Sequence, residues 1–186
     1  MKNFFSRINI ASYNFDFKDT ICLYILVFLA GSLAGFIYEE MFTLLFDHVL
    51  IKRGFLYGPY LPVYGFGSVL LVFTLKRFKK NPLVVFFLAM LVTGVLEYFT
   101  GYFLWEIYHK NWWDYSGLFL NINGYVCLRS ILTFGIGGLL LIYIVEPLIS
   151  LFISKISKYK IYILSYCVCV IFMFDLILTL LFKNKI

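Results

Sequence analysis

The sequence predicts an all-α, polytopic membrane protein with about five transmembrane helices. Of its 186 residues, 62% are hydrophobic, 22% are aromatic and 14% are charged, whereas soluble domains average about 45–50% apolar and about 25% charged residues. A soluble domain of this length cannot bury so much apolar surface in one core. A disordered chain is excluded as well, because disordered segments are poor in aromatic residues.

Long apolar runs indicate where the chain crosses the membrane, since a helix needs about 20 mostly apolar residues to do so. Such runs lie near residues 20–46, 60–75, 82–105, 125–145 and 161–182. Residues 1–18 precede the first run, and we expect them to form an interfacial N-terminal segment. Because the five runs use most of the chain, we predict one integral membrane domain over residues 1–186.

The distribution of Lys and Arg predicts the orientation of the chain, because these residues favour the cytoplasmic side. Ten of them lie in the N-terminal segment and in the loops around 76–80 and 155–160, and five lie in the alternate loops and at the C-terminus. This asymmetry predicts a cytoplasmic N-terminus and an external C-terminus. The three Trp residues cluster around the predicted outer loop that holds Trp112 and Trp113.

Several classes of site are not supported by the sequence. The net charge of +6 is not gathered in a basic stripe, so we expect no nucleic-acid partner. No P-loop motif occurs, so the chain does not bind ATP through one. We expect no metal ion and no other cofactor, because the cysteines and histidines lack ligand spacing. These residues are Cys22, Cys127, Cys167, Cys169, His48 and His109.

A Gly/Pro-rich segment is the first candidate site. Six of the fourteen residues from Gly54 to Gly67 are Gly or Pro and none is charged, so the segment resists a regular helix yet is too apolar for an ordinary loop. One interpretation is a re-entrant segment that lines a substrate cavity. The alternative is an outer loop that runs into a helix capped by Pro62. Its candidate residues are Tyr57, Tyr60 and Tyr64 for the cavity and Gly54, Gly58, Gly65 and Gly67 for close backbone approach.

Ionisable residues inside the apolar runs form the second candidate site, because a charge in the bilayer centre costs about 2.5–3.5 kcal/mol on insertion scales. Arg129 is expected to pair with Glu97 or with Glu39. The alternative is an ion pair that only stabilises the structure, with no substrate or ion passing it. Asp175, with Thr179 one turn later, is expected to face a partner chain or a second subunit.

The third candidate site lies between the predicted third and fourth spans. The segment contains Trp112-Trp113-Asp114-Tyr115-Ser116 and then Asn121-Ile122-Asn123-Gly124. Asp114 and Asn123 would serve a lid or outer vestibule in one interpretation. In the other, the segment is held at the membrane surface by its aromatic rings. In the first span, Gly31 and Gly35 are spaced for close helix packing.

These motifs together resemble a known family. Four motifs follow one another along the chain. In order, they are Arg-Gly-Phe-Leu-Tyr-Gly-Pro-Tyr-Leu-Pro-Val-Tyr-Gly, Glu97-Tyr98 with Gly101, Trp113-Asp114-Tyr115-Ser116 and Asn121-Ile122-Asn123-Gly124. In this, residues 20–150 resemble the bacterial family labelled putative ABC-transporter type IV permeases, of the CmpB kind. The resemblance implies a protein of the bacterial cytoplasmic membrane with a permease role, and it carries over no substrate and no catalytic residue. The last span lies outside the matched part.

The sequence therefore predicts a transport-related integral membrane subunit with an outward-facing aromatic and polar cavity. Its partners would be the lipid bilayer and either a second copy of the chain or a separate membrane or ATPase subunit. An enzyme that acts on a lipid or lipid-linked substrate is one alternative, with Glu97 as general base and Arg129 as phosphate ligand. The sequence lacks the cluster of acids or histidines that such chemistry usually shows. A small scaffold or regulatory subunit is the other alternative.

Overall fold

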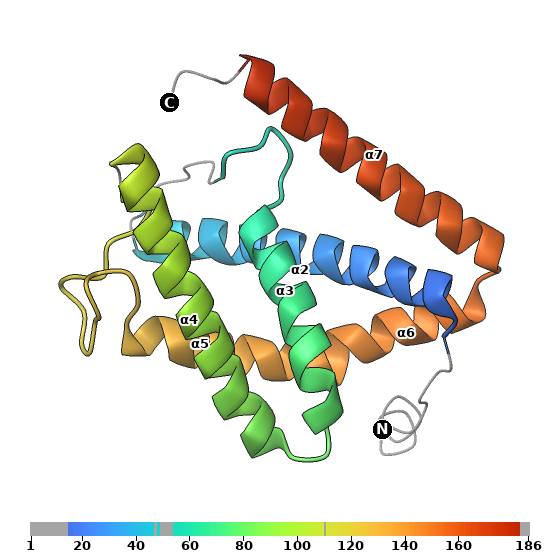
Figure 1. Cartoon of the computed structure of the whole chain (residues 1–186), viewed down its shortest axis with the longest axis horizontal. Helices are drawn as coiled ribbons and strands as arrows, with labels where there is room; N and C mark the ends of the chain where they lie inside the picture. The colour runs from blue at the N-terminus through green and yellow to red at the C-terminus, as the bar shows by residue number, and fades with distance from the viewer. Residues whose placement is uncertain (1–14, 47, 49–53, 110, 183–186) are drawn as a thin grey trace. The chain divides into compact units, whose positions relative to one another are not determined.

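The structure, a computed structural model, describes residues 15–46, 48, 54–109 and 111–182. The regular secondary structure of this part is helical, apart from one isolated β-bridge between Ile122 and Val126. The α-helices are labelled in Figure 1. Their bounds are α2 Phe17–Phe46, α3 Pro62–Leu75, α4 Pro82–Tyr108, α5 Leu128–Leu140, α6 Glu146–Lys155 and α7 Lys158–Phe182. A 3-10 turn, Lys76–Phe78, follows α3, and a π-helical turn, Leu141–Val145, joins α5 to α6.

Four helical stretches in the described residues are long and apolar enough to cross a membrane, so the chain is a membrane protein. They are Phe17–Leu45, Pro82–Tyr108, Leu128–Lys155 and Lys158–Phe182. The predicted span near 60–75 corresponds to α3, which has only 14 residues. At 1.5 Å per residue it is about 21 Å long, against about 30 Å for the hydrocarbon layer. The prediction of five full spans is therefore not confirmed.

The chain forms two compact units. One comprises Met1–Val69 together with Val145–Ile186, and the other comprises Leu70–Ile144. Each is described by itself below. The prediction of a single domain over residues 1–186 remains a prediction.

In the first unit, α2 packs against α6 and α7. The Lys158 ammonium lies 2.6 Å from the carboxylate of Asp16 and 3.1 Å from that of Asp19. The Tyr162 hydroxyl also donates to Asp19, at 3.1 Å. The lysine side chain holds the pKa of Asp16 below its ordinary value by hydrogen bonding. These contacts join the N-terminal ends of α2 and α7.

Helix α3 packs against the face of α2 that contains Gly31 and Gly35. A Cβ at Gly31 would lie 2.2 Å from the Ser68 Oγ, and a Cβ at Gly35 would lie 2.2 Å from the Tyr64 ring. Side chains at either position would collide with α3, so only glycine permits this approach. The packing predicted from the spacing of Gly31 and Gly35 is confirmed.

In the second unit, α4 and α5 pack along one another. Glycines of α5 allow the close contact: a Cβ at Gly138 would lie 2.5 Å from the Ala89 Cβ, and a Cβ at Gly135 would lie 2.7 Å from the Phe86 ring. The Asn81 side chain accepts the N–H groups of Leu83 and Val84 and so caps the start of α4. This pair of helices supports the loop that connects them, residues 111–127.

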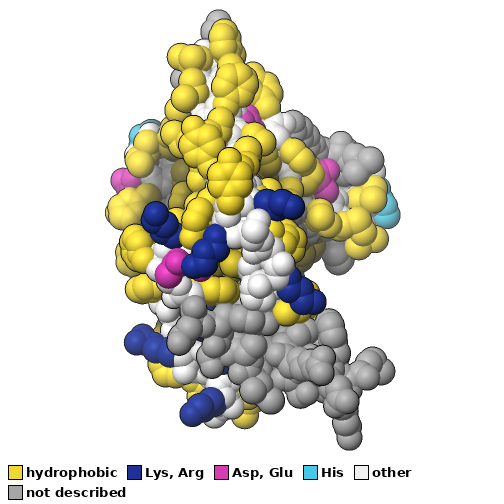
Figure 2. Space-filling view, turned by 90° about the vertical axis from the view of Figure 1, so that its right-hand side faces the viewer, with side chains coloured by type: hydrophobic (Ala, Val, Ile, Leu, Met, Phe, Trp, Pro, Cys, Tyr) yellow, Lys and Arg dark blue, Asp and Glu magenta, His cyan; other side chains and the backbone are white. Residues whose placement is uncertain are grey.

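Large apolar side chains cover much of the surface. In Figure 2, hydrophobic side chains predominate among the described residues in the upper part of the view, and most Lys and Arg side chains lie below them. On α7, Tyr166 is 71% exposed and Leu181 is 68% exposed. Such a surface is unfavourable in water and suits a lipid environment.

Candidate functional site

The carboxylate of Glu97 connects three segments of the second unit. Glu97 lies in α4, within the stretch Pro82–Tyr108 that can span a membrane. Its Oε1 accepts the Tyr115 hydroxyl at 3.0 Å and its Oε2 accepts the Ser130 hydroxyl at 2.7 Å. Tyr115 belongs to the loop after α4, and Ser130 lies in the first turn of α5. The glutamate thus ties the loop and α5 to α4.

Ser130 is held in place by a capping box at the start of α5. Cys127 has an extended backbone, and its sulfur accepts the N–H of Ser130 at 3.4 Å. The Ser130 Oγ in turn accepts the N–H of Cys127 at 3.2 Å. Ser130 is buried, so its hydroxyl is presented to Glu97 inside the protein. The reciprocal bonds of this box fix its position.

The loop that carries Tyr115 is ordered by its own polar side chains. The Asp114 Oδ1 accepts the backbone N–H of Ser116 at 2.8 Å and its hydroxyl at 2.5 Å. These bonds hold the pKa of Asp114 below its ordinary value. The Trp113 indole donates to the Tyr125 carbonyl at 2.9 Å. Tyr115 is consequently fixed between two anchored neighbours.

Asn123 and Gly124 close this loop with unusual backbone conformations. Their φ values are 53° and 73°. The left-handed region is open to Gly and tolerated by Asn. A Cβ at Gly124 would also lie 2.9 Å from the Asp114 Oδ1. The Asn123 amide donates to the Tyr98 hydroxyl at 2.9 Å. Tyr98 directly follows Glu97 in the sequence.

A cavity of about 180 Å³ lies in this loop. Two of the residues predicted from the sequence, Asp114 and Asn123, line it. The other side chains of its wall are those of Trp105, Asn111, Ser116 and Tyr125. Tyr115 stands in the sequence between two wall residues and bonds to Glu97. A residue that adjoins two wall residues in the chain therefore contacts the Glu97 carboxylate.

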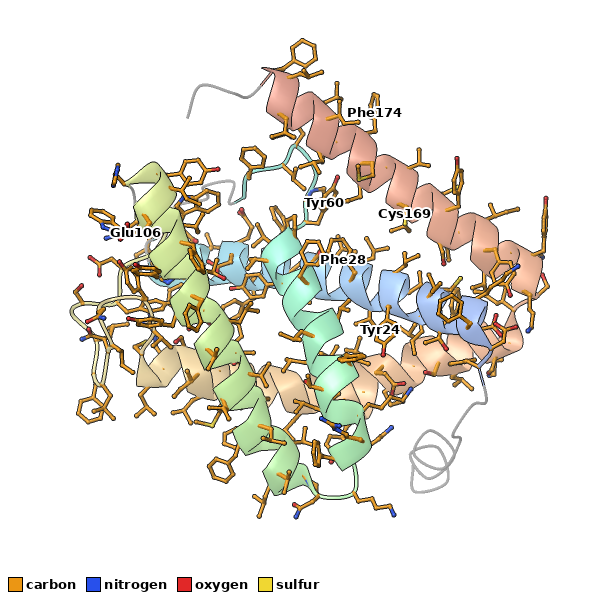
Figure 3. The ribbon with its side chains drawn as sticks, viewed as in Figure 1. Tyr24, Phe28, Tyr60, Glu106, Cys169 and Phe174 are labelled. Atoms are coloured by element: carbon orange, nitrogen blue, oxygen red, sulfur yellow. The ribbon has the colours of Figure 1, made fainter. Side chains whose placement is uncertain are left out.

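In the first unit, the segment Gly54–Leu61 is held by a carboxylate of α7. The Asp175 Oδ1 accepts the N–H of Tyr57 at 3.0 Å, and its Oδ2 accepts the N–H of Gly58 at 2.7 Å. The Tyr60 hydroxyl bonds to Oδ2, and the Thr179 hydroxyl lies 3.2 Å from Oδ1. Figure 3 shows Tyr60 between this segment and α7.

Asp175 was expected to face a partner chain or a second subunit, and that expectation is wrong. Asp175 is 8% exposed and turned toward the segment that precedes α3. The sequence contained no sign of this, because more than a hundred residues separate the acid from its donors.

The Gly/Pro-rich segment is only partly irregular. Its irregular backbone ends at Leu61, and Gly65 and Gly67 lie within α3, which begins at Pro62. The helix start expected at Pro62 in the alternative interpretation is thus observed. The Leu61 N–H donates to the carbonyl of Ser32 at 3.0 Å. Ser32 is near the middle of α2, so the chain has returned alongside α2 before α3 begins.

The predicted site residues fall into two groups, one in each unit. Glu39, Tyr57, Tyr60 and Tyr64 belong to the first unit, and Glu97, Asp114, Asn123 and Arg129 to the second. In the first group, the Tyr64 hydroxyl bonds to Glu39 and the Tyr60 hydroxyl to Asp175. The joining of the two groups in one cavity remains a prediction, as does the pairing of Arg129 with Glu97 or Glu39.

Sequence reasoning missed Glu146. The fourth span was predicted to end at Val145, which left Glu146 outside it. The helical stretch instead continues to Lys155, so Glu146 lies inside it. Glu146 is 3% exposed, and its Oε1 accepts the Ser150 hydroxyl at 3.0 Å. The spacing of four residues between these two polar groups was the available signal.

No group of three His, Cys, Asp or Glu side chains in the part of the chain that the structure describes is arranged to hold a metal ion.

One comparison with known proteins gave a match. A sequence model of the family described as "Putative ABC-transporter type IV" matches residues 26–180. The match extends through most of α7, which the sequence motifs alone had left outside the resemblance. Neither the curated proteins nor the solved structures gave a match.

Proposed function

Because the chain belongs to the family described as "Putative ABC-transporter type IV", we propose that it is a transport-related membrane subunit whose substrate path passes Glu97. The observation that carries this proposal is the pair of hydrogen bonds from Tyr115 and Ser130 to the Glu97 carboxylate. Ionisable groups within spans are costly and typically mark a path for substrate or ions.

The loop cavity would be the outer entrance of this path. Its wall contains aromatic rings and polar groups together, as small-molecule sites do. Tyr115 would relay occupation of the cavity to Glu97, because a shift of the loop changes the Tyr115–Glu97 hydrogen bond. A ligand arriving from outside would then meet Asp114 and Asn123 before the intramembrane carboxylate.

We further propose that the chain crosses the bacterial cytoplasmic membrane five times, with its N-terminus inside and its C-terminus outside. The excess of Lys and Arg in the N-terminal, 76–80 and 155–160 regions supports this orientation. The ion pairs of Lys158 with Asp16 and Asp19 support a topology in which α2 and α7 start on the same side of the membrane. The chain must then cross an even number of times between them.

Three of these crossings would be α2, α4 and the stretch α5–α6, so an even number requires a fourth. We assign it to Gly54–Leu61 and α3 together, as a broken span with an extended half and a helical half. The bonds from Leu61 to Ser32 and from Gly58 to Asp175 support a segment that enters the apolar layer. Backbone outside a helix is tolerated there when its polar groups are satisfied by protein.

The subunit would act with partners. These 186 residues contain no P-loop, so an ABC-type mechanism would need an ATPase that they do not supply. The many exposed apolar side chains of α7 are available to lipid, to a second copy of the chain or to another membrane subunit.

The proposal is tested by measuring uptake and efflux of a panel of labelled small molecules in cells that produce the protein. Glu97→Gln should abolish the movement that the wild-type protein confers, and Tyr115→Phe should reduce it. Glu106→Gln is the matched control, because Glu106 lies in the same helix and is exposed (Figure 3).

Equal movement with Glu97→Gln and wild type would contradict the proposal. A second result would also contradict the proposal: no compound in the panel moves in a protein-dependent way, while the protein purifies from native membranes in a stable complex. That second result would indicate the scaffold alternative.

A further inference from the structure

The cavity in the loop after α4 combines a carboxylate with aromatic rings and has no basic side chain among the described residues of its wall. Among these described residues Asp114 is the one acid, and Trp105 and Tyr125 supply the rings. Asp114 is exposed, and its ordinary state at neutral pH is the carboxylate, which the two bonds from Ser116 favour further. The described residues of the wall therefore carry one negative charge, which disfavours carboxylate and phosphate ligands.

Asp114 retains an unused acceptor. Both bonds from Ser116 end on Oδ1, and within the described residues no hydrogen bond to Oδ2 is formed. The Asn123 side chain likewise uses its amide nitrogen for Tyr98, which leaves its carbonyl oxygen available. The cavity thus offers acceptor oxygens to a ligand that donates or that is positively charged.

The rings select the same kind of ligand. The faces of Trp and Tyr attract organic cations, Trp most strongly, and such rings recognise quaternary ammonium groups. Trp105 lies in the last turn of α4, and Tyr125 lies three residues before α5. Both stand at or near helix ends, and Trp and Tyr side chains at the ends of membrane helices tend to lie at the headgroup level.

The size of the cavity restricts the ligand. Its volume of about 180 Å³ is below the ~300–1,000 Å³ of sites for drug-sized molecules. A single ammonium-bearing group fits this space better than an extended molecule does.

From these observations we propose that the cavity binds a small organic ammonium group through Asp114, Trp105 and Tyr125. This inference rests on the proposed function, in which it names the substrate class. The ammonium group belongs either to a free compound, such as choline, or to the headgroup of an aminophospholipid.

Binding is measured by titration calorimetry on the full chain in nanodiscs made of phosphatidylglycerol alone. The probes are choline and 3,3-dimethylbutan-1-ol, which has the same shape without the charge. Choline should bind saturably and the alcohol should not. Asp114→Asn should weaken choline binding about tenfold, as expected for loss of one close charge. The asparagine oxygen can still accept from Ser116, so the loop is kept.

Two further variants separate the rings from the fold of the loop. Trp105→Leu should also weaken choline binding. Trp112→Leu is its matched control, since Trp112 is in the same region, is 45% exposed and does not line the cavity. Nanodiscs that contain phosphatidylethanolamine identify the source: competition with choline there indicates the lipid headgroup, and unchanged choline binding indicates the free compound.

Equal binding of the alcohol and choline would overturn the inference, and so would the absence of choline binding in both lipid compositions. Unchanged affinity in both Asp114→Asn and Trp105→Leu would overturn it too. If ammonium binding fails while Glu97-dependent movement of another compound persists in cells, only this inference fails. If choline binds but no movement depends on Glu97, only the proposed function fails.

Discussion

The carboxylate of Asp175 accepts the backbone N–H of Gly58 at 2.7 Å, across 117 positions of the sequence. The same carboxylate accepts from Tyr57, Tyr60 and Thr179, and all of these donors are neutral. A buried carboxylate is stabilised by several hydrogen bonds when no cation lies beside it. Asp175 therefore fixes the path of the chain into α3.

Asp175→Asn should lower the free energy of unfolding in detergent by about 1–3 kcal/mol, because an amide NH2 would face backbone N–H groups and leave them unsatisfied. Thermal unfolding in detergent measures this. Glu106→Gln, at an exposed position, should change the midpoint little. The loss should be non-additive with that of Tyr60→Phe, since both variants remove the same contact. Fully additive losses would argue against the hydrogen bond between Asp175 and Tyr60.

Arg129 is predicted to neutralise an acid inside the protein, Glu97 first and Glu39 second. Arg129→Leu and Glu97→Leu should each destabilise the protein, because each leaves one charge uncompensated. The double variant should recover part of the loss. Thermal unfolding of the two single variants and the double variant tests the pair, and the same set is made with Glu39→Leu. Strict additivity in both sets would rule the pairing out.

The contact between the starts of α2 and α7 should depend on charge and on salt. Lys158→Asp should lower the melting temperature, and the exchange Asp16→Lys with Lys158→Asp should restore part of it. The effect will be small, because the side chains of Lys158 and Asp16 are 64% and 49% exposed and exposed pairs are weak. High salt should remove the difference. A melting temperature that is equally lowered in the exchanged variant would count against the ion pair.

The loop after α4 should lose order in acid. The pKa of Asp114 is lowered in the folded loop, so its stabilising contribution is complete above the ordinary value of about 3.9 and is lost as the pH falls through the lower folded pKa. Ser116→Ala removes the hydroxyl bond, the larger of the two causes, and should move the transition to higher pH. The fluorescence of Trp113 reports it in a protein with Trp105→Phe and Trp112→Phe. An identical pH profile with and without Ser116 would refute the assignment.

The crossing of α2 and α3 should not tolerate a methyl group on its glycine face. Gly35→Ala should destabilise the protein by about 1–3 kcal/mol, because the new Cβ would lie 2.2 Å from the Tyr64 ring. Gly137→Ala is the control, since a Cβ there meets no atom within 4 Å. Alanine favours a helix over glycine by about 1 kcal/mol, so the control should be neutral or stabilising. Both are measured by thermal unfolding, and equal effects would contradict the close approach.

Composition and local spacing were sufficient to predict the helical membrane architecture and the glycine packing of Gly31 and Gly35. Both depend on residues that lie close together in the sequence. The partners of Glu97 were harder to predict, because a hydroxyl such as that of Ser130 has no sequence signature and its direction is set by a cap. The bonds to Asp175 were not predictable at all. They join segments over a hundred residues apart, and one sequence contains no record of such distances.

The length of α3 shows another limit. The run 60–75 is as apolar as a span, yet its helix begins only at Pro62 and has 14 residues. Hydropathy measures the preference for lipid and not the backbone conformation, so an extended half and a helical half look alike in composition. That both halves together cross the membrane remains a prediction.

The π-helical turn Leu141–Val145 has a consequence for alignment. A π turn holds about one residue more than an α turn, and one residue of an α-helix is worth about 100° of rotation. The turn lies between the end of α5 at Leu140 and the start of α6 at Glu146. A homologue that lacks one residue here would continue from α5 into α6 as an ordinary α-helix. Alignments of this region should allow a single-residue gap inside the membrane, where gaps are normally forbidden.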